Sequence, residues 1–215
     1  MNTKEIREYK KTLKLSKRQR DIIVGLLLGD GHLETQDNGR TYRLKVEHGM
    51  RQKDYAEWLF SEFKDWIPTA HLYRKVRENG HESTGFTTYS HGAFRFYGKA
   101  FYNSCHVKHI PTTIRKLMKP IGIAVWFMDD GSRKSLKHKT YNIHTLGYTK
   151  KDLVRLQAVL KELFDIDTKL HSQKNKCWRV YIPSNSAHRF VDLVEEFVRP
   201  IQSMRNKLVT TLPKK

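Results

Sequence analysis

The chain has 215 residues, enough to bury one large hydrophobic core or two smaller ones. Lysine and arginine number 41 against 22 aspartate and glutamate, and the resulting formal net charge of +19 favours a polyanionic partner such as nucleic acid. The 38% hydrophobic and 11% aromatic content argue against a disordered tail, and two cysteines are too few for a disulfide framework.

The first half of the chain is predicted to begin with an apolar helix. Ser16 and Gln19 fit a capping box, and the apolar residues that follow at helical spacing lead to Gly31, which can end the helix. Residues 41–48 alternate between apolar and polar, as in a half-buried strand, and the Asp-Asn-Gly-Arg sequence before them predicts a hairpin turn. The other elements predicted here are an amphipathic helix over 53–67, a strand over 71–77 with Val76 facing inward, a strand over 94–97 and a short helix.

The second half repeats this order of elements. An apolar helix over 120–128 ends at Asp129, Asp130 and Gly131, and residues 140–145 alternate as the next strand. Thr149 is predicted to cap a long helix, with Asp152 in the capping-box position. The remaining predicted elements are strands over 168–173 and 178–182, a turn between them at 174–175, and a helix over 185–198.

The two halves look like copies of one unit. Asp30-Gly31 recurs as Asp130-Gly131, and Thr41-Tyr42 recurs as Thr140-Tyr141. We also match Phe-Arg-Phe-Tyr at 94–97 with Trp-Arg-Val-Tyr at 178–181. These matches predict an α+β fold with a pseudo-twofold duplicated αββαββα unit, which suits the local twofold symmetry of duplex DNA. We divide the chain into a basic N-terminal extension (1–15), a first half (16–115) and a second half (116–215).

Asp30 and Asp130 each lie where an apolar helix ends and the chain turns into a strand. If the two helices pack side by side, both carboxylates reach the same end of the contact, and Gly25 and Gly29 would allow a close approach. Two carboxylates on a basic surface suit Mg²⁺, which can activate water and stabilise the leaving oxygen in phosphodiester hydrolysis. Gly-Asp-Gly is also a common turn sequence, but its recurrence after a second apolar helix favours a composite metal site.

The segments Ile-Val-Gly-Leu-Leu-Leu-Gly-Asp-Gly (23–31) and Ile-Ala-Val-Trp-Phe-Met-Asp-Asp-Gly (123–131) resemble the two motifs of LAGLIDADG homing endonucleases, in their single-chain, two-motif branch. The resemblance extends from about Ser16 to about Leu208. It implies two four-stranded antiparallel sheets that form a DNA-binding saddle. It also implies a monomeric, intron-encoded, metal-dependent endodeoxyribonuclease that cuts both strands of a long, asymmetric double-stranded DNA target.

The resemblance implies roles for four residues around the two motif ends. In the family, the acid in the eighth motif position holds the catalytic divalent metal, which implies that Asp30 and Asp130 bind Mg²⁺ or Mn²⁺. Gly29 and Asp129 stand beside them in the seventh position and are included in the expected metal site. A small residue is usual at that position, so we expect no more than a supporting role for Asp129.

The family also places basic residues near the active site. By resemblance these are Lys108, in a Lys-His-Ile-Pro stretch, and Lys207, in Met-Arg-Asn-Lys-Leu, and both are expected to be catalytic. Val125 stands where the motif has glycine, which predicts looser or asymmetric helix packing on that side.

The polar faces of the predicted strands carry a mixture of side chains typical of DNA groove readout and phosphate contact. In the first half the candidate DNA-binding residues are Arg40, Arg43, Lys45, Tyr73, Lys75, Arg77 and Arg95. In the second half they are Asn142, His144, Lys169, His171, Gln173 and Arg179. Two basic loops add Lys134, Lys137, Lys139 and Lys174 as candidate phosphate contacts.

Other functions fit parts of the sequence. An RNA-binding intron maturase with the same fold would share the charge and both motifs. A transcription regulator on this fold would be expected to lack one or both acids, and no cysteine or histidine pair completes a zinc-nuclease pattern around His106 and His109. The composition alone would also fit a basic housekeeping protein, such as a ribosomal protein. The sequence has no apolar stretch long enough for a membrane and no apolar signal core, so we expect an intracellular, non-secreted protein without a membrane partner.

Overall fold

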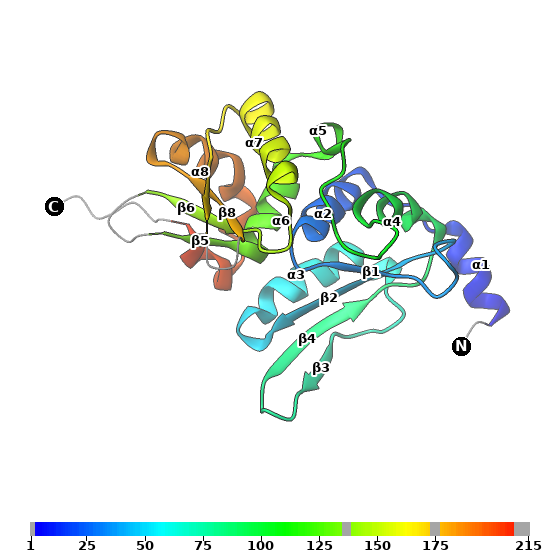
Figure 1. The fold of residues 1–215 in the computed structure, drawn as a ribbon. Coiled ribbons are helices and arrows are strands. Elements are labelled where there is room, and N and C mark those ends of the chain that lie inside the picture. The colour runs from blue at the N-terminus through cyan, green and yellow to red at the C-terminus, as the bar shows by residue number, and fades with distance from the viewer. Residues whose placement is uncertain (1–2, 135–138, 173–176, 209–215) are drawn as a thin grey trace.

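The computed structural model describes residues 3–134, 139–172 and 177–208, and it contains two four-stranded antiparallel sheets (Figure 1). The first sheet has the strand order β1-β2-β4-β3 and the second has the order β5-β6-β8-β7. The two sheets therefore share one topology, and helices cover one face of each (Figure 1). This arrangement confirms the predicted α+β fold of two repeated units.

A short helix, α1 (Lys4–Thr12), lies in the N-terminal extension, and the first half begins with the predicted apolar helix, α2 (Lys17–Leu28). The predicted capping box is present, because the N–H of Gln19 donates to Ser16 Oγ and the N–H of Ser16 donates to Gln19 Oε1, both at 3.0 Å. The other described elements of this half are β1 (His32–Glu34), β2 (Arg43–Gly49), η1 (Met50–Gln52), α3 (Lys53–Phe63), η2 (Lys64–Trp66), β3 (Tyr73–Val76), β4 (Glu82–Thr87), η3 (Gly92–Phe94), α4 (Arg95–Phe101) and α5 (Ile114–Leu117).

The second half begins with α6 (Pro120–Asp130), which has a proline in its first turn and is buried from Ile121 to Met128. Thr149 caps α7 (Lys150–Phe164) as predicted, since its hydroxyl accepts from the Asp152 N–H. The other described elements are β5 (Gly131–Arg133), β6 (Tyr141–His144), β7 (Lys169–Ser172), β8 (Trp178–Ile182), α8 (Ser184–Val198) and η5 (Gln202–Lys207). None of the described helices is long and apolar enough to cross a membrane.

Helices α2 and α6 pack side by side between the two sheets (Figure 1). At Gly25 the helices approach so closely that an added Cβ would lie 2.7 Å from Val125 Cβ. The expected close approach is therefore present. Val125 itself is fully buried, so the packing at this point is asymmetric, with a glycine of α2 facing a valine of α6, and it is not loose.

The strand predicted over 94–97 is wrong, because these residues end η3 and begin α4. Phe94, Tyr97 and Phe101 are buried at helical spacing, and four alternating residues alone cannot distinguish a strand from a helix. The missed strand is β4, whose buried positions include Ser83, Thr84 and Gly85 in place of an apolar alternation. The counterpart of β8 is therefore β4, and the match between 94–97 and 178–181 does not reflect the duplication. The match of Thr41-Tyr42 with Thr140-Tyr141 is also wrong, because the strand registers make Lys45 the counterpart of Asn142.

Val76 also differs from the prediction, since its side chain is 59% exposed. It lies on β3, the edge strand of its sheet, in a hairpin that projects beyond the helix layer (Figure 1). The alternation of the sequence indicates which face a residue points toward, but it cannot tell whether a helix covers that part of the face.

Candidate active site

The ends of α2 and α6 bring the two motif acids together at one end of the helix contact. Gly29 is the C-terminal cap of α2, and Asp30 follows it directly, whereas Asp130 is the last residue of α6. Strands β1 and β5 begin within two residues of these acids, so each sheet starts at the same end of the helix pair. As expected, both acids lie at the same end of the helix pair.

Three carboxyl groups crowd this end of the helix pair. Asp30 is exposed, Asp130 is partly buried, and the side chain of Asp129 has no exposed surface. Burial, followed by the nearby Asp30, raises the pKa of Asp130 to about 7, against the lowering effect of Lys108 and Lys207. Burial and Asp30 also raise the pKa of Asp129. The cluster thus carries more negative charge than its surroundings stabilise, and a divalent cation would relieve this repulsion.

The two lysines expected near the site occupy equivalent positions in the two halves. Lys108 Nζ donates to the carbonyl oxygen of Gly29 at 2.7 Å. Lys207 Nζ donates to the carbonyl oxygen of Met128 and, at 3.2 Å, to that of Asp129. Each ammonium group therefore contacts the carbonyl that immediately precedes a motif acid. Burial lowers the pKa of both lysines, while the three aspartates oppose this effect.

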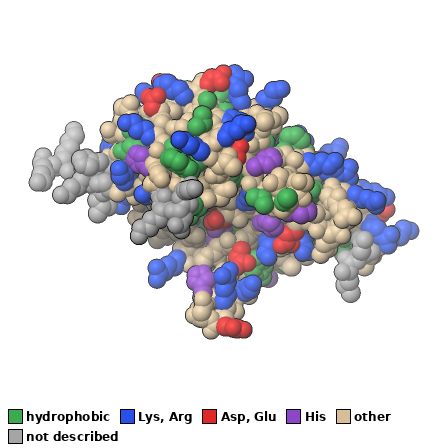
Figure 2. All heavy atoms as spheres, in the orientation of Figure 1, with side chains coloured by type: hydrophobic (Ala, Val, Ile, Leu, Met, Phe, Trp, Pro, Cys, Tyr) green, Lys and Arg blue, Asp and Glu red, His purple; other side chains and the backbone are tan. Residues whose placement is uncertain are grey.

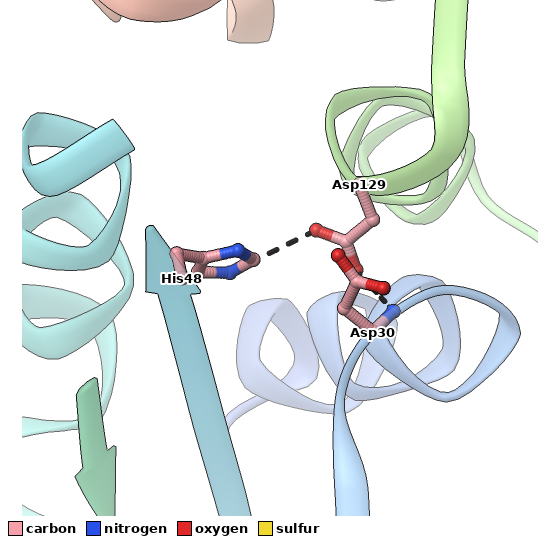
Figure 3. Close-up of side chains that lie close together, drawn as sticks. All are labelled: Asp30, His48 and Asp129. Carbon is pink, nitrogen blue, oxygen red and sulfur yellow. Dashed lines mark hydrogen bonds and ion pairs between the residues drawn. The ribbon is translucent and has the colours of Figure 1, made fainter. Parts of the chain in front are cut away.

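Asp129 connects the two halves of the site. Its Oδ2 accepts a hydrogen bond from the backbone N–H of Asp30 at 2.9 Å, and its Oδ1 accepts one from the Tyr55 hydroxyl at 2.8 Å. The Nε2 atom of His48 lies 4.0 Å from the same Oδ1 (Figure 3). Asp129 thus has direct contact with the peptide of a motif acid, a more specific structural role than the sequence indicated.

Two tyrosines outside the predicted set of site residues hold the C-terminal ends of α2 and α6. The Tyr55 hydroxyl, from α3, lies 3.5 Å from the carbonyl oxygen of Val125 in addition to its bond with Asp129. The Tyr148 hydroxyl donates to the carbonyl oxygens of Leu27 and Leu28, at 3.1 and 2.9 Å. Each half therefore supplies a hydroxyl group to the C-terminal end of the other half's motif helix.

A cavity of about 230 Å³ opens beside Asp130. Its lining residues come from both halves and are Leu28, Gly29, Lys108, Asp130, His144, Thr145, Leu146, Gly147 and Tyr148. On the Asp129 side the described side chains are more closely packed: Asp129 accepts from the Tyr55 hydroxyl, and the ring of Tyr55 lies 4.8 Å from that of His48. The site is therefore open on the Asp130 side and narrower on the Asp129 side.

The strand registers place most of the candidate DNA-binding residues on the sheet faces turned away from the buried core. In the first sheet Lys45 is paired with Thr87, and Lys75 with Ser83, on this outward face. The candidates that share an outward register in the two sheets are Arg43, Lys45, Tyr73, Lys75, Asn142, His144, Lys169, His171 and Arg179. Figure 2 shows Lys and Arg side chains spread widely over the surface in this view, including the projecting β3–β4 hairpin.

The two outward faces differ in their acidic residues. Glu34 pairs with Arg43 and Lys45, and Glu47 pairs with Arg77, which follows β3. On the second sheet the described outward positions hold no carboxylate: Lys134 lies over the ring of Tyr181, which also stacks with His171. Asn142 has the expected register but is only 5% exposed. The second face therefore has the less compensated positive charge.

The remaining candidates lie elsewhere. Arg95 is on α4 and not on a strand, which corrects the prediction: its Nε donates to the carbonyl oxygen of Arg40 at 2.6 Å. Arg40 is exposed in the loop before β2, and Lys139 is exposed before β6. Lys137, Gln173 and Lys174 lie outside the described residues.

The chain is similar in sequence and in structure to known proteins of one family. The sequence model of the LAGLIDADG DNA endonuclease family matches residues 20–190. DNA endonuclease I-ChuI of Chlamydomonas applanata is 28% identical, over 91% of this chain and 96% of that protein. The solved structure of the homing endonuclease I-WcaI bound to its DNA recognition sequence superposes with a TM-score of 0.87 and 27% identity, over 98% of this chain and 95% of that one. The cytochrome b mRNA maturase bI2 of Debaryomyces hansenii is 25% identical, over 90% of this chain and 74% of that protein.

Proposed function

Because the chain belongs to the LAGLIDADG DNA endonuclease family, we propose that it is a homing endonuclease that cuts both strands of a long, asymmetric DNA target. One observation carries the proposal: Asp30 and Asp130 lie together at the end of α2 and α6, each beside a lysine, where two basic sheets begin. As simple helix ends these acids would be unfavourable, because burial and the neighbouring Asp30 raise the pKa of Asp130 to about 7.

The donor set at this position fits a hard divalent cation. The carboxylates of Asp30 and Asp130 would hold Mg²⁺ or Mn²⁺. The carbonyl oxygens of Gly29 and Asp129, also expected in the metal site, accept hydrogen bonds from Lys108 and Lys207, so they would hold the lysines beside the ion. Bound divalent ions would supply an activated water and stabilise the leaving oxygen of the phosphodiester. The shortage of positive charge around three carboxyl groups is the observation that supports this fit.

The protein's own residues would position and neutralise the reacting phosphates. The ammonium groups of Lys108 and Lys207 are held by carbonyl oxygens next to the acids, so they would stabilise the charge that develops on each cleaved phosphate. The Tyr55 and Tyr148 hydroxyls fix the helix ends from which Asp130 and Asp30 project. The two sheets would bind the DNA on either side of the acids, with base contacts in the grooves and lysines on phosphates.

The test is cleavage of the DNA sequence into which the reading frame's host element has inserted. A plasmid that carries this sequence without the insertion should be linearised by the purified protein in Mg²⁺ and remain intact in EDTA. A plasmid that keeps the insertion should resist cleavage, since the element interrupts the target. Absence of linear product from the uninterrupted plasmid, under conditions where the protein is folded and binds that DNA, would contradict the proposal.

A role in RNA splicing is the second candidate function. The similarity to the maturase bI2 supports it, and the net charge of +19 suits RNA as well as DNA. The test is splicing of a precursor RNA that contains the host intron, with and without the protein. Faster splicing that persists in the Asp30→Asn variant would indicate an activity separate from cleavage.

A further inference from the structure

The site is asymmetric in a way that concentrates ligand atoms on one side of the helix pair. His32 and Ser132 each lie two residues after a motif acid. His32 pairs with Lys45 in the first sheet, and Ser132 pairs with Asn142 in the second. This register makes His48 the counterpart of Thr145, just as the motifs make Asp129 the counterpart of Gly29. The Asp130 side therefore has a glycine, a threonine and a cavity, and the Asp30 side has a carboxylate and an imidazole.

The imidazole on that side has an unusual environment. His48 is 4% exposed, and its Nε2 atom has no hydrogen-bond partner among the residues that the structure describes. Leaving a buried polar atom unpaired costs free energy, so such an atom requires an explanation. The ring points toward the carboxylates of Asp30 and Asp129 (Figure 3), and one atom from each of the three side chains lies within 4.8 Å of the others.

We propose that Asp30, His48 and Asp129 form a binding site for a divalent transition-metal ion of the Co²⁺ or Zn²⁺ class. One imidazole nitrogen with two carboxylate oxygens suits these ions, whereas Mg²⁺ and Ca²⁺ prefer oxygen alone. Ligand atoms about 2.0–2.2 Å from one such ion in tetrahedral geometry lie about 3.3–3.6 Å apart. The 4.0 Å between His48 Nε2 and Asp129 Oδ1 would shorten by about half an ångström on binding, and the exposed side chain of Asp30 can move toward the other two ligands.

The surroundings of Asp129 support a ligand role. Its two oxygens are held by the Tyr55 hydroxyl and the Asp30 N–H, and carboxylates that bind metals are commonly oriented by such hydrogen bonds. Lys207 lies close enough to oppose a cation, but three carboxyl groups outnumber the two lysines here. The site uses Asp30, a ligand of the proposed catalytic metal. Ion binding itself does not depend on the proposed function, because it is measured without DNA.

The experiment is a titration of the metal-free, full-length protein with Co²⁺, followed by the visible absorption of the bound ion. One equivalent should bind, Zn²⁺ should displace it, and millimolar Mg²⁺ should not. His48→Gln should weaken Co²⁺ binding about tenfold or more. Two matched controls should bind as the unsubstituted protein does: His144→Gln, which removes the imidazole beside Asp130, and His188→Gln, which removes an exposed histidine paired with Asp192.

A second measurement does not depend on any variant. In the unsubstituted protein, Zn²⁺ should shift the imidazole nitrogen resonances of His48 in NMR spectra and leave those of His144 unchanged. Equal Co²⁺ affinity in folded His48→Gln, or a Zn²⁺ shift at His144 alone, would overturn the proposal. Failure of DNA cleavage with Co²⁺ binding intact would count against the proposed function only.

Discussion

At the scale of single residues, the separate roles of the three aspartates can be tested by removing charge and keeping shape. Asp30→Asn and Asp130→Asn should each reduce double-strand cleavage by at least about 10²-fold, because each removes a carboxylate that would hold the catalytic divalent ion. DNA binding should survive or tighten, since a negative charge is lost beside the phosphates. Plasmid cleavage in Mg²⁺ and gel shifts in Ca²⁺ measure the two effects separately.

Asp129→Asn is the matched control for this comparison. The asparagine oxygen can still accept from the Asp30 N–H, and its amide can donate to the Tyr55 hydroxyl oxygen, so the loss of cleavage should be smaller. Normal cutting by either Asp30→Asn or Asp130→Asn would show that this carboxylate is not a catalytic ligand. If both variants lose folding and DNA binding together, Asp30 and Asp130 have only a structural role at the helix ends.

The pKa of Asp130 predicts a specific dependence of stability on pH. Its pKa is about 7 in the folded protein against 3.8 ordinarily, so folding favours the protonated carboxyl group. The stability that this group contributes is therefore complete below about pH 4 and is lost as the pH rises through about 7. In EDTA, the gain in unfolding free energy from Asp130→Asn should be larger at pH 8 than at pH 5. Urea unfolding at both pH values measures this difference, and parallel pH profiles for the two proteins would refute it.

Which residues of the site could be predicted depends on whether the duplication marks them. Asp30 and Asp130 recur after equivalent helices, so the sequence alone indicates that they meet. His48, Tyr55 and Tyr148 have no such repeat. His48 continues the inward alternation of Leu44 and Val46, and Tyr55 lies on the buried face of α3, so both look like ordinary core residues. Their role depends on the packing of β2 and α3 against the other half, which no local pattern encodes.

At the scale of elements, the close contact of α2 with α6 predicts a severe effect of one methyl group. Gly25→Ala would place a Cβ 2.7 Å from Val125 Cβ and even nearer the backbone of Gly122, so the helices must separate. We expect a loss of about 1–3 kcal/mol in unfolding free energy, together with lower activity because the acids move apart. Gly147→Ala is the control, since an added Cβ there meets no atom within 4 Å. Equal urea midpoints for the two variants would contradict the close contact.

Elements with strong periodicity could be predicted, and short ones could not. The capping box, the buried run of α2 and the Thr149 cap were sufficient to place α2 and α7. Segment 94–97 was wrongly predicted as a strand and β4 was missed, because the secondary structure of both depends on their neighbours. Strand β4 is held between β2 and β3, where small polar residues can be buried with their backbone paired. A central strand of this kind needs its partners to be recognised.

At the scale of the whole molecule, the pairing of two unlike halves within one chain predicts a monomer. The apolar surfaces of α2 and α6 already cover each other, and the outward faces differ in their acidic residues. We expect one copy per DNA duplex and a footprint over an imperfect palindrome. Light scattering coupled to size exclusion, with and without DNA, checks the stoichiometry. A dimer that protects a perfect palindrome would contradict this expectation.

The distribution of charge predicts which face of the molecule meets DNA. Each lysine that binds a phosphate releases counterions, so affinity should fall by about 10³–10⁵ between 50 and 200 mM salt if about 6–10 such contacts form. Lys169→Gln, on the exposed outward face of β7, should lower the slope of log affinity against log salt by about 1. Lys161→Gln changes the same charge on α7, where Lys161 pairs with Asp165 and Asp167, and should leave the slope unchanged. Fluorescence anisotropy at several salt concentrations gives both slopes. If Lys161→Gln lowers the slope as much as Lys169→Gln does, the DNA does not lie on the sheets.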